Sequence, residues 1–472
     1  MRNFPKFIFS LNFLYILLIA AESVAIIFLC LYVPAILPVA VTLISVWLVT
    51  LVSVIIVASR GITPEINLSV VLFMIALPVA GACLYALSRI KRERCALLTV
   101  LNAPDSDGLE GVAQKYCGIP SAGYDKAVYF KCGEQFFPAL FEEIENAKER
   151  VYLEYFIVRK GEIFSRLLSA LRTAKNNGAE IKIIIDGIGS AFKTRKKDYK
   201  KLKALGAEVK IFHRLLPLID TRLNTRDHRK IAAIDSKVAF TGGFNIADEY
   251  ANVESPLGYW KDTGVAVYGK AAKIFEGMFL SVWKGAHTLK YEDGGNEKCL
   301  PFYDSPPKIG GFCENAYAAA IFSAKKRVHI FTPYFCPGEK LICALEFAAM
   351  RGTDVKIIIP HIPDKKYAFE LSKATASSLL AKGIEFYEYT PGFMHAKCLI
   401  ADDRVFIGSY NFDFRSLRLN YECGVSFEGE ICDRAETDFN ECLQLSSPLK
   451  EAKLSLPRRF YRFILKLFAP LM

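Results

Sequence analysis

The sequence predicts an α/β protein made of two tandem repeats that pack together as a pseudo-dimer, preceded by N-terminal transmembrane helices. Two observations predict the duplication. The pattern HxKxxxxD occurs twice, beginning at His228 and at His395, and the residues that follow also align, KIAAIDSKVAFTGGFN with KCLIADDRVFIGSYN. A third observation, the long apolar stretches before residue 90, predicts the membrane segments, because about twenty apolar residues in a helix span a bilayer.

Each repeat is predicted to run strand, helix, strand, helix, strand and then a hairpin that carries the motif. Upstream segments match in the same order, RVYLEYFIV with RVHIFTPYF and EIKIIIDGIG with DVKIIIPHIP. Between the strands, stretches such as 161–180 and 365–383 carry apolar residues three and four apart and have Gly at or near their ends, which predicts amphipathic helices. This alternation predicts a largely buried sheet covered by helices.

We expect the chain to be divided into six parts. In order, these are a membrane anchor of two to three transmembrane helices at 1–90, a linker at 91–123, the first repeat at 124–292, a linker at 293–309, the second repeat at 310–450 and a basic amphipathic tail at 451–472. A chain of 472 residues has room for two domains of ordinary size plus an anchor.

The membrane anchor is predicted from the near absence of charge. Residues 7–59 contain one charged side chain, Glu22, and residues 66–88 contain none. Transmembrane spans fit at roughly 9–31, 36–58 and 67–88. A cleaved signal peptide stays open for the first span, and a re-entrant pair stays open for the first two.

Basic residues near the spans set the expected orientation in the cell membrane. The four basic residues at 89–94 follow the last span and favour a cytoplasmic catalytic region. Arg2 and Lys6 favour a cytoplasmic N-terminus, and three spans cannot satisfy both preferences. We favour the four-charge cluster and a multi-pass protein, and an external catalytic region stays open.

Basic charge elsewhere in the chain fits a protein that works against anionic lipid. The net charge is +11, and a basic run occupies 193–201, for which a solvated helix face is an equal alternative. In the last segment, PRRFYRFILKLFAPLM, a helix would align Arg458, Arg462 and Lys466 on one face with apolar side chains around them. This pattern predicts an interfacial membrane contact.

His and Lys two residues apart on a strand point to the same face, so each motif presents an imidazole beside an ammonium group. The candidate catalytic pairs are His228 with Lys230 and His395 with Lys397. Such a pair suits a phosphate diester, because the imidazole can attack phosphorus or donate a proton and the ammonium can bind the non-bridging oxygens. The chemistry needs one neutral and one protonated His, which predicts that the two pKa values are shifted apart.

The acidic residue of each motif has a different predicted role. Asp235 and Asp402 lie seven residues beyond their His, an odd offset that places them on the opposite face of a regular strand. We expect both to support the site structurally without carrying protons. The stretch from Asp402 to Asn411 is one residue shorter than the stretch from Asp235 to Asn245. We expect the missing residue at the turn near Asp403.

These motifs and their context resemble the phospholipase D superfamily, whose members carry two such motifs, and more narrowly its bacterial cardiolipin synthase family. The similarity covers nearly the whole chain and includes LEYFIV, DGIGS, TGGFNIADEY, TPYFCP, GSYNFDFRS and LNYE. The resemblance implies a transphosphatidylation without metal or cofactor. In that reaction, two phosphatidylglycerol molecules give cardiolipin and glycerol through a phosphatidyl-histidine intermediate.

The resemblance also implies roles for single residues. It favours His228 as the nucleophile and His395 as the acid and base. Phosphoryl oxygens would be bound by Lys230, Lys397, Asn245, Asn411 and Ser409, where the last replaces Gly243 of the first copy. Acidic residues downstream of the motifs, Asp262 and Glu422, are expected to orient the imidazole of the motif that each follows, and a surface salt bridge is the alternative for either.

Three classes of function stay open from the sequence. The first is a cardiolipin-forming transferase, the second is a phospholipase D-type hydrolase that uses water, and the third is a noncatalytic lipid-binding membrane protein. A nucleic-acid partner is disfavoured because membrane anchoring accounts for the basic charge and no array of stacking aromatic residues is evident. The thirteen cysteines are scattered without a CxxC pair, so they indicate neither a disulfide framework nor a zinc site.

Overall fold

The computed structural model describes residues 97–190, 196–213, 225–306, 311–450 and 455–468, together with a few positions between 24 and 75. The chain forms two compact units. One spans 94–462 without 215–224 and contains both repeats, and the other contains 1–93, 215–224 and 463–472. No helix within the described residues is long and apolar enough to cross a bilayer. The expected spans at 9–31, 36–58 and 67–88 lie outside those residues, apart from the few positions noted above.

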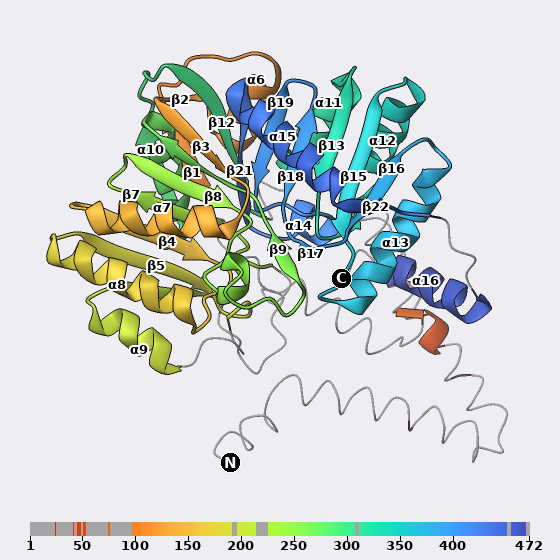
Figure 1. Cartoon of the computed structure of the whole chain (residues 1–472), viewed down its shortest axis with the longest axis horizontal. Helices are drawn as coiled ribbons and strands as arrows, with labels where there is room; N and C mark the ends of the chain where they lie inside the picture. Colours follow the sequence, from red (N-terminus) through yellow and green to blue (C-terminus); the bar gives the residue numbers. More distant parts are fainter. Residues whose placement is uncertain are drawn as a thin grey trace. The chain divides into compact units, whose positions relative to one another are not determined.

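The first repeat is built on a seven-stranded sheet (Figure 1). In hydrogen-bonded order, its strands are β3 (Lys126–Phe130), β10 (Gly264–Tyr268), β8 (Val238–Gly242), β7 (Lys230–Ile234), β4 (Arg150–Tyr155), β5 (Glu180–Asp186) and β6 (Glu208–Phe212). Its helices are α7 (Gly133–Asn146), α8 (Glu162–Asn176), α9 (Lys196–Ala204) and α10 (Lys270–Lys284). Ile231 and Ala233 of β7 pack in the same apolar cluster as α10, whereas Ala232 and Ile234 pack in the cluster of α7 and α8. Because side chains alternate along a strand, these helices cover opposite faces of the sheet.

The second repeat is built on a nine-stranded sheet (Figure 1). In hydrogen-bonded order, its strands are β2 (Ala122–Tyr124), β12 (Glu297–Asp304), β21 (Glu422–Glu428), β19 (Arg404–Gly408), β18 (Cys398–Ala401), β13 (Arg327–Phe331), β15 (Asp354–Pro360), β16 (Glu385–Tyr389) and β22 (Ser446–Pro448). Its helices are α11 (Phe312–Ser323), α12 (Glu339–Met350), α13 (Lys366–Leu380), the short α14 (Phe414–Arg418) and α15 (Glu430–Gln444).

The two sheets share one topology. Reading β3-β10-β8-β7-β4-β5-β6 against β12-β21-β19-β18-β13-β15-β16 pairs each strand with its counterpart in the other repeat. The directions also agree, since β4, β5 and β6 are parallel, as are β13, β15 and β16, and each motif hairpin is antiparallel. The predicted duplication and α/β class are confirmed.

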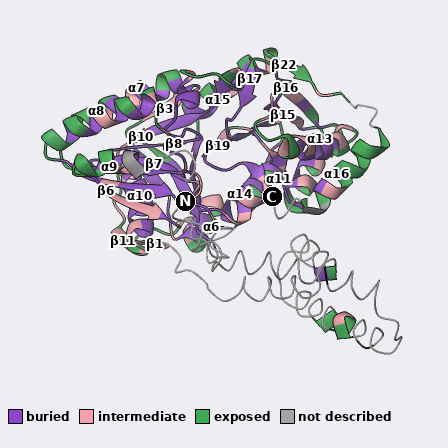
Figure 2. Ribbon diagram, turned by 90° about the horizontal axis from the view of Figure 1, so that it is seen from below, coloured by how far each residue is buried: buried purple, intermediate pink, exposed green. Residues whose placement is uncertain are grey.

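The repeats are joined by a common core. One apolar cluster contains strands of the second sheet together with α10 and one face of β7 and β10 from the first. Figure 2 shows that the strands are mainly buried, while the outer faces of helices such as α8 and α16 (Leu456–Phe468) are exposed. Burial of this shared apolar surface holds the repeats in contact.

The structure differs from the expected organisation at both linkers. The stretch 293–309 contains β12, which pairs with β21 inside the second sheet, and 91–123 contains β1 (Leu97–Leu101), α6 (Gly108–Cys117) and the edge strand β2. Pro301 made β12 hard to predict, because proline has no N–H for a ladder. β2 pairs only with residues 297–299, so β12 has no strand on its β2 side at Pro301, and its pairing there is with β21 alone.

Candidate active site

Each motif lies at the edge of its sheet where the parallel strands end. β7 begins at Lys230, opposite the last residue of β4, and β18 begins at Cys398, opposite the last residue of β13. His228 and His395 come just before these hairpin strands. Both imidazoles therefore lie at the end of the sheet where the parallel strands have their carboxyl termini.

The backbone before each His is held by the other repeat. The His228 N–H donates to the Tyr421 carbonyl (2.9 Å), and the Tyr421 N–H donates to the Arg226 carbonyl (2.7 Å). In the second motif, β17 (Gly392–Met394) pairs in parallel with β9 (Tyr259–Lys261), and the His395 N–H donates to the Lys261 carbonyl (2.7 Å). These reciprocal contacts bring the two motifs together.

The carboxylates that orient the imidazoles also come from the opposite repeat. His228 Nδ1 lies 2.9 Å from Glu422 Oε1, and His395 Nδ1 lies 2.6 Å from Asp262 Oδ2. We expected each acid to serve the motif that it follows, so the pairing is crossed. It is crossed because the segment carrying each acid runs beside the other repeat's His segment. Both acids are fully buried, and neither forms a surface salt bridge.

Charge at the site is set by burial and by the two lysines. Burial lowers the pKa of Lys230 to about 8 and of Lys397 to about 7. Burial also lowers the pKa of His228 to about 4 and of His395 to about 3. The charge of Lys397 further lowers the pKa of His228, and the charge of Lys230 further lowers the pKa of His395. Each lysine thus acts across the repeats. These shifts oppose protonation of both imidazoles, whereas we expected the two pKa values to be shifted apart.

The pKa values of the two acids that orient the imidazoles, Asp262 and Glu422, are lowered despite burial. Burial opposes ionisation of Asp262, but the charges of His395 and Lys397 outweigh it and hold the pKa of Asp262 below its ordinary value. Burial likewise opposes ionisation of Glu422, and His228 and Lys230 outweigh it to lower the pKa. An ionised carboxylate on each Nδ1 fixes that nitrogen as the N–H donor and leaves Nε2 for chemistry.

Ser409 supports a carboxylate, and the hydrogen bonds of its hydroxyl are to Glu422 and to the backbone of Cys423. Its hydroxyl donates to Glu422, whose other oxygen accepts from Ser416 Oγ (2.6 Å). At the equivalent position, a Cβ on Gly243 would lie 1.9 Å from Asp262 Oδ1. The longer Glu422 is therefore held by an extra hydroxyl, and the shorter Asp262 needs a glycine beside it.

The two Asn residues are not equivalent. Asn245 Oδ1 accepts from the Ile157 N–H (3.0 Å), and its Nδ2 donates to Tyr250 Oη (2.7 Å), so this amide braces the first repeat. Asn411 is buried, and its Oδ1 has no hydrogen-bond partner among the described residues. Of the two, Asn411 retains more capacity to bind a ligand.

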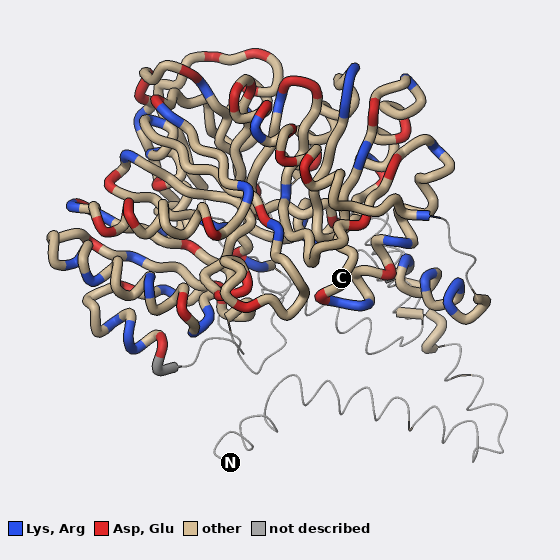
Figure 3. Tube along the Cα trace, viewed as in Figure 1, with Lys and Arg blue, Asp and Glu red and all other residues tan. Residues whose placement is uncertain are grey.

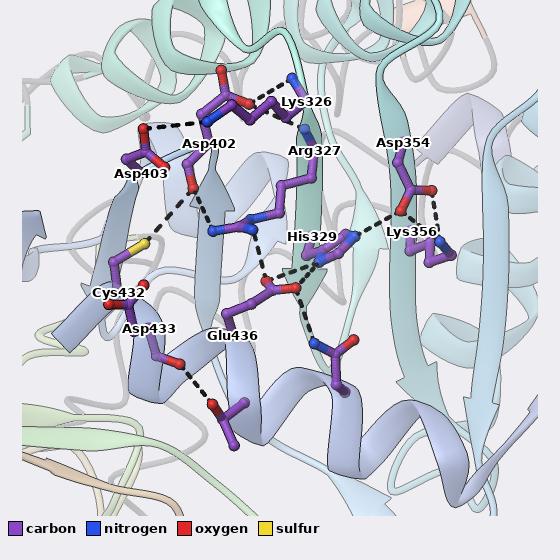
Figure 4. Close-up of polar contacts among 12 residues, drawn as sticks. Lys326, Arg327, His329, Asp354, Lys356, Asp402, Asp403, Cys432, Asp433 and Glu436 are labelled. Atoms are coloured by element: carbon purple, nitrogen blue, oxygen red, sulfur yellow. Dashed lines mark hydrogen bonds and ion pairs between the residues drawn. The ribbon is translucent and has the colours of Figure 1, made fainter. Parts of the chain in front are cut away.

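Asp235 and Asp402 lie at the far end of the hairpins. Asp235 accepts backbone N–H groups from residues 148–150, and Asp402 accepts them from residues 325–327, all at 2.7–3.0 Å. In the second repeat, this turn adjoins a network in which His329 contacts Glu436 (2.9 Å) and Asp354 (3.2 Å) (Figure 4). Both aspartates thus tie the hairpin turn to the segment before the neighbouring strand.

The residue missing from the second motif is missing from its turn. The strands of the first hairpin are joined by residues 235–237 and those of the second by residues 402–403. Beyond the turn the registers coincide, since the Gly243 N–H donates to the Thr263 carbonyl and the Ser409 N–H to the Cys423 carbonyl, both at 2.9 Å. The shorter hairpin therefore leaves the site end in register.

Aromatic rings that sequence reasoning missed enclose both imidazoles. Tyr250 and Trp260 lie 5.2 Å and 5.0 Å from the His395 ring, and Phe156 lies 5.0 Å from the His228 ring. Their positions near strand ends gave no signal that distinguishes them from core residues. These rings pack against the imidazoles that the carboxylates orient.

Two His–Lys pairs from duplicated α/β repeats, joined by crossed carboxylates, define a protein of the phospholipase D class. The chain belongs to the family described as cardiolipin synthase, phospholipase D-like domain, whose model matches residues 140–283 and 317–443. A cardiolipin synthase of Clostridium perfringens is 32% identical over 87% of this chain and 94% of its own length. One of Listeria monocytogenes is 34% identical over 73% of this chain and 74% of its own.

Two further matches extend this comparison. An uncharacterised protein of Streptococcus mutans is 38% identical over 75% of this chain and 80% of its own length. Among solved structures, the phosphatidylserine synthase of Haemophilus influenzae matches 77% of this chain and 98% of its own, with a TM-score of 0.60 and 16% identity. At that identity, the structural match supports the fold.

Proposed function

We propose that the protein is a cardiolipin synthase, a phosphatidyltransferase that joins two phosphatidylglycerol molecules and releases glycerol. The observation that carries this proposal is the site itself. Two imidazoles, each with a carboxylate on Nδ1 and a lysine beside it, meet across the repeats of a chain in this family. The named relatives supply the choice of lipid.

In the first step, we assign the attack to His228. Its Nε2 forms a bond to phosphorus as the bond from phosphorus to the glycerol oxygen breaks, and His395 gives its Nε2 proton to that oxygen. Burial opposes protonation of both imidazoles before substrate binds, so His395 must take up a proton from solvent to act as the acid. Asp262 and the anionic diester both favour the imidazolium of His395. The choice of His395 as the acid follows the family resemblance, because the pKa is lowered at both His residues and does not separate their roles.

In the second step, His395 changes from proton donor to proton acceptor. His395, now neutral, takes a proton from a headgroup hydroxyl of a second phosphatidylglycerol. That oxygen attacks phosphorus and the bond from phosphorus to His228 breaks, which releases cardiolipin. Lys230, Lys397 and Asn411 bind the phosphoryl oxygens, and the ammonium charges offset the charge that develops on them. Asn245, Ser409, Glu422 and Asp262 hold these groups in place.

The proposed setting is the cell membrane, with residues 1–90 as the anchor and the repeats at the cytoplasmic face. The four basic residues at 89–94 support this orientation. The substrate-binding partner is an anionic phospholipid, which the net charge of +11 complements.

The test is product analysis with purified full-length protein in phosphatidylglycerol vesicles. We expect cardiolipin and glycerol in equal amounts, measured by mass spectrometry. Phosphatidic acid without cardiolipin would instead identify a hydrolase, and no turnover would favour a lipid-binding protein. His228→Ala and His395→Ala should each lower kcat by at least about 10³-fold, whereas His361→Ala, outside the motifs, should not.

The same system tests the assignment of the nucleophile. Rapid acid quench followed by peptide mass spectrometry should find the phosphatidyl adduct on the peptide that contains His228. An adduct only on the peptide that contains His395 would reverse the two roles and leave the paired mechanism intact.

A further inference from the structure

The C-terminal helix α16 exposes its apolar side chains. Leu456 is 78% exposed, Phe460 is 66% exposed and Phe463 is 56% exposed. At spacings of four and three residues, these side chains form one stripe along the helix. A helix on a protein surface usually buries such a stripe and turns its charges to water.

The opposite face of α16 carries arginines that are bound to the protein. Arg462 Nε donates to Glu370 Oε2 (2.9 Å), and Arg458 donates to Glu370 Oε1 (2.5 Å). Glu370 lies on α13, beside which α16 is drawn in Figure 1. Arg462 is only 8% exposed. Two arginines of the helix thus face α13, and the stripe of Leu456, Phe460 and Phe463 is exposed.

This orientation changes how the tail is interpreted. Arg458 and Arg462, which the sequence suggested would face lipid, are occupied by one carboxylate. Arg459 and Lys466 remain exposed near the stripe, and Lys365 and Lys366 at the start of α13 are exposed as well. In Figure 3, which has the view of Figure 1, several Lys and Arg positions are coloured blue along α13 and α16. Exposed cations beside exposed apolar side chains complement an anionic lipid surface.

A cavity separates the two helices. It has a volume of about 450 Å³ and is lined by Pro363, Lys366, Phe369, Glu370, Arg458 and Tyr461. The ion pairs of Arg458 and Arg462 with Glu370 hold the helix directly to α13 beside this cavity. This attachment fixes the position of the helix and leaves Leu456, Phe460 and Phe463 exposed.

The start of α13 also adjoins the second motif. Tyr334 donates to Asp364, just before α13, and Lys365 lies over the Tyr334 ring at 5.1 Å. The strand after Tyr334, β14 (Phe335–Cys336), pairs with β20 (Phe412–Asp413), which directly follows Asn411. A surface that docks on α13 and α16 is therefore close to the candidate active site.

We infer that α16 lies in the boundary between headgroups and acyl chains of an anionic phospholipid bilayer, with Leu456, Phe460 and Phe463 inserted. The ion pairs of Arg458 and Arg462 with Glu370 determine which face of the helix is inserted. Docking this face brings substrate headgroups to the second motif. The inference rests on the proposed function only for the identity of the lipid.

Photo-crosslinking in the full-length protein tests the insertion directly. A benzoylphenylalanine replaces Phe460 in one variant and Phe347 in a matched control, because Phe347 lies on α12 and is 49% exposed. After irradiation in phosphatidylglycerol vesicles, we expect a lipid adduct on the peptide that contains position 460 and not on that of position 347. Equal labelling, no lipid adduct at 460, or an adduct to a second protein chain would overturn the inference.

A paired activity measurement separates docking from chemistry. We expect Phe460→Glu to lower kcat/KM on vesicles about tenfold more than on a soluble short-chain phosphatidylglycerol, while Phe347→Glu changes both equally. Equal loss on the two substrates would count against docking. If the unmodified protein makes no cardiolipin but the adduct forms at position 460, the proposed function fails and the docking stands.

Discussion

At the scale of single residues, Lys397 links activity to pH. Burial lowers its pKa to about 7, and burial lowers the pKa of Lys230 to about 8. As the pH rises, Lys397 loses its charge first, and the site then binds a phosphate diester less strongly. We expect kcat/KM on short-chain phosphatidylglycerol to fall as the pH rises from about 7 to 8, in the range of these two pKa values.

Lys397→Arg tests whether this residue causes the alkaline loss. Guanidinium stays charged at every pH of the assay, so the variant should keep its own maximal kcat/KM to higher pH, although that maximum is reduced by the different geometry. Lys382→Arg, at an exposed position on the surface, is the control. An unchanged alkaline limb in Lys397→Arg would assign the titration to another group.

Gly243 and Ser409 occupy equivalent positions of the two repeats but differ in what the neighbouring carboxylate requires. A Cβ at Gly243 would displace the Asp262 carboxylate that orients His395, whereas Ser409 donates to Glu422. We expect Gly243→Ala to lower kcat by about 10²-fold and Ser409→Ala by about tenfold, because loss of a supporting hydrogen bond costs less than displacing the orienting acid. Steady-state kinetics with matched thermal denaturation curves would measure this, and equal effects would contradict it.

At the scale of elements, each hairpin turn is fastened by its aspartate. Asp402→Asn retains the side-chain size and tolerates the φ of 51°, but it cannot accept three N–H groups as the carboxylate does. We expect the free energy of unfolding to fall by about 1–3 kcal/mol while kcat changes less than about twofold. Asp403→Asn is the control, because the Asp403 side chain is 79% exposed.

The pH dependence of that stability follows from the pKa of Asp402. Burial opposes ionisation, but the three backbone N–H groups outweigh it and lower the pKa below the ordinary value of 3.8. The stabilisation is therefore complete above pH 3.8 and is lost as the pH falls through the lowered pKa. Thermal denaturation should separate wild type from Asp402→Asn equally at pH 7 and pH 5. A gap that closes between these values would require a different cause.

The elements differ in how far the sequence predicts them. The motif hairpins and the matched strands were predictable, because the same apolar pattern and the same polar residues occur twice. β12 was not, since Pro301 interrupts the pattern, and the sequence does not show that β2 ends before Pro301. The crossed carboxylates were not predictable either. The offset from His228 to Asp262 gives no information about which repeat Asp262 faces, because the packing of the repeats decides it.

At the scale of the whole molecule, neither repeat contains a complete site. His228 depends on Glu422 and Tyr421, and His395 depends on Asp262 and Lys261, so each imidazole is held by the other repeat. The shared apolar core holds the repeats together within one chain. We therefore expect the catalytic unit to be a single polypeptide, whatever the oligomeric state.

Mixing two inactive variants tests this expectation. His228→Ala and His395→Ala, purified separately and reconstituted into the same phosphatidylglycerol vesicles, should make no more cardiolipin together than either makes alone. In the control, wild type mixed with either variant should retain activity in proportion to the wild-type fraction. Recovery of activity in the doubly inactive mixture would mean that His228 of one chain works with His395 of another. The repeats would then have to separate from their shared core and pair between chains, and the cost of exposing that apolar surface to water is the physical reason that we expect no recovery.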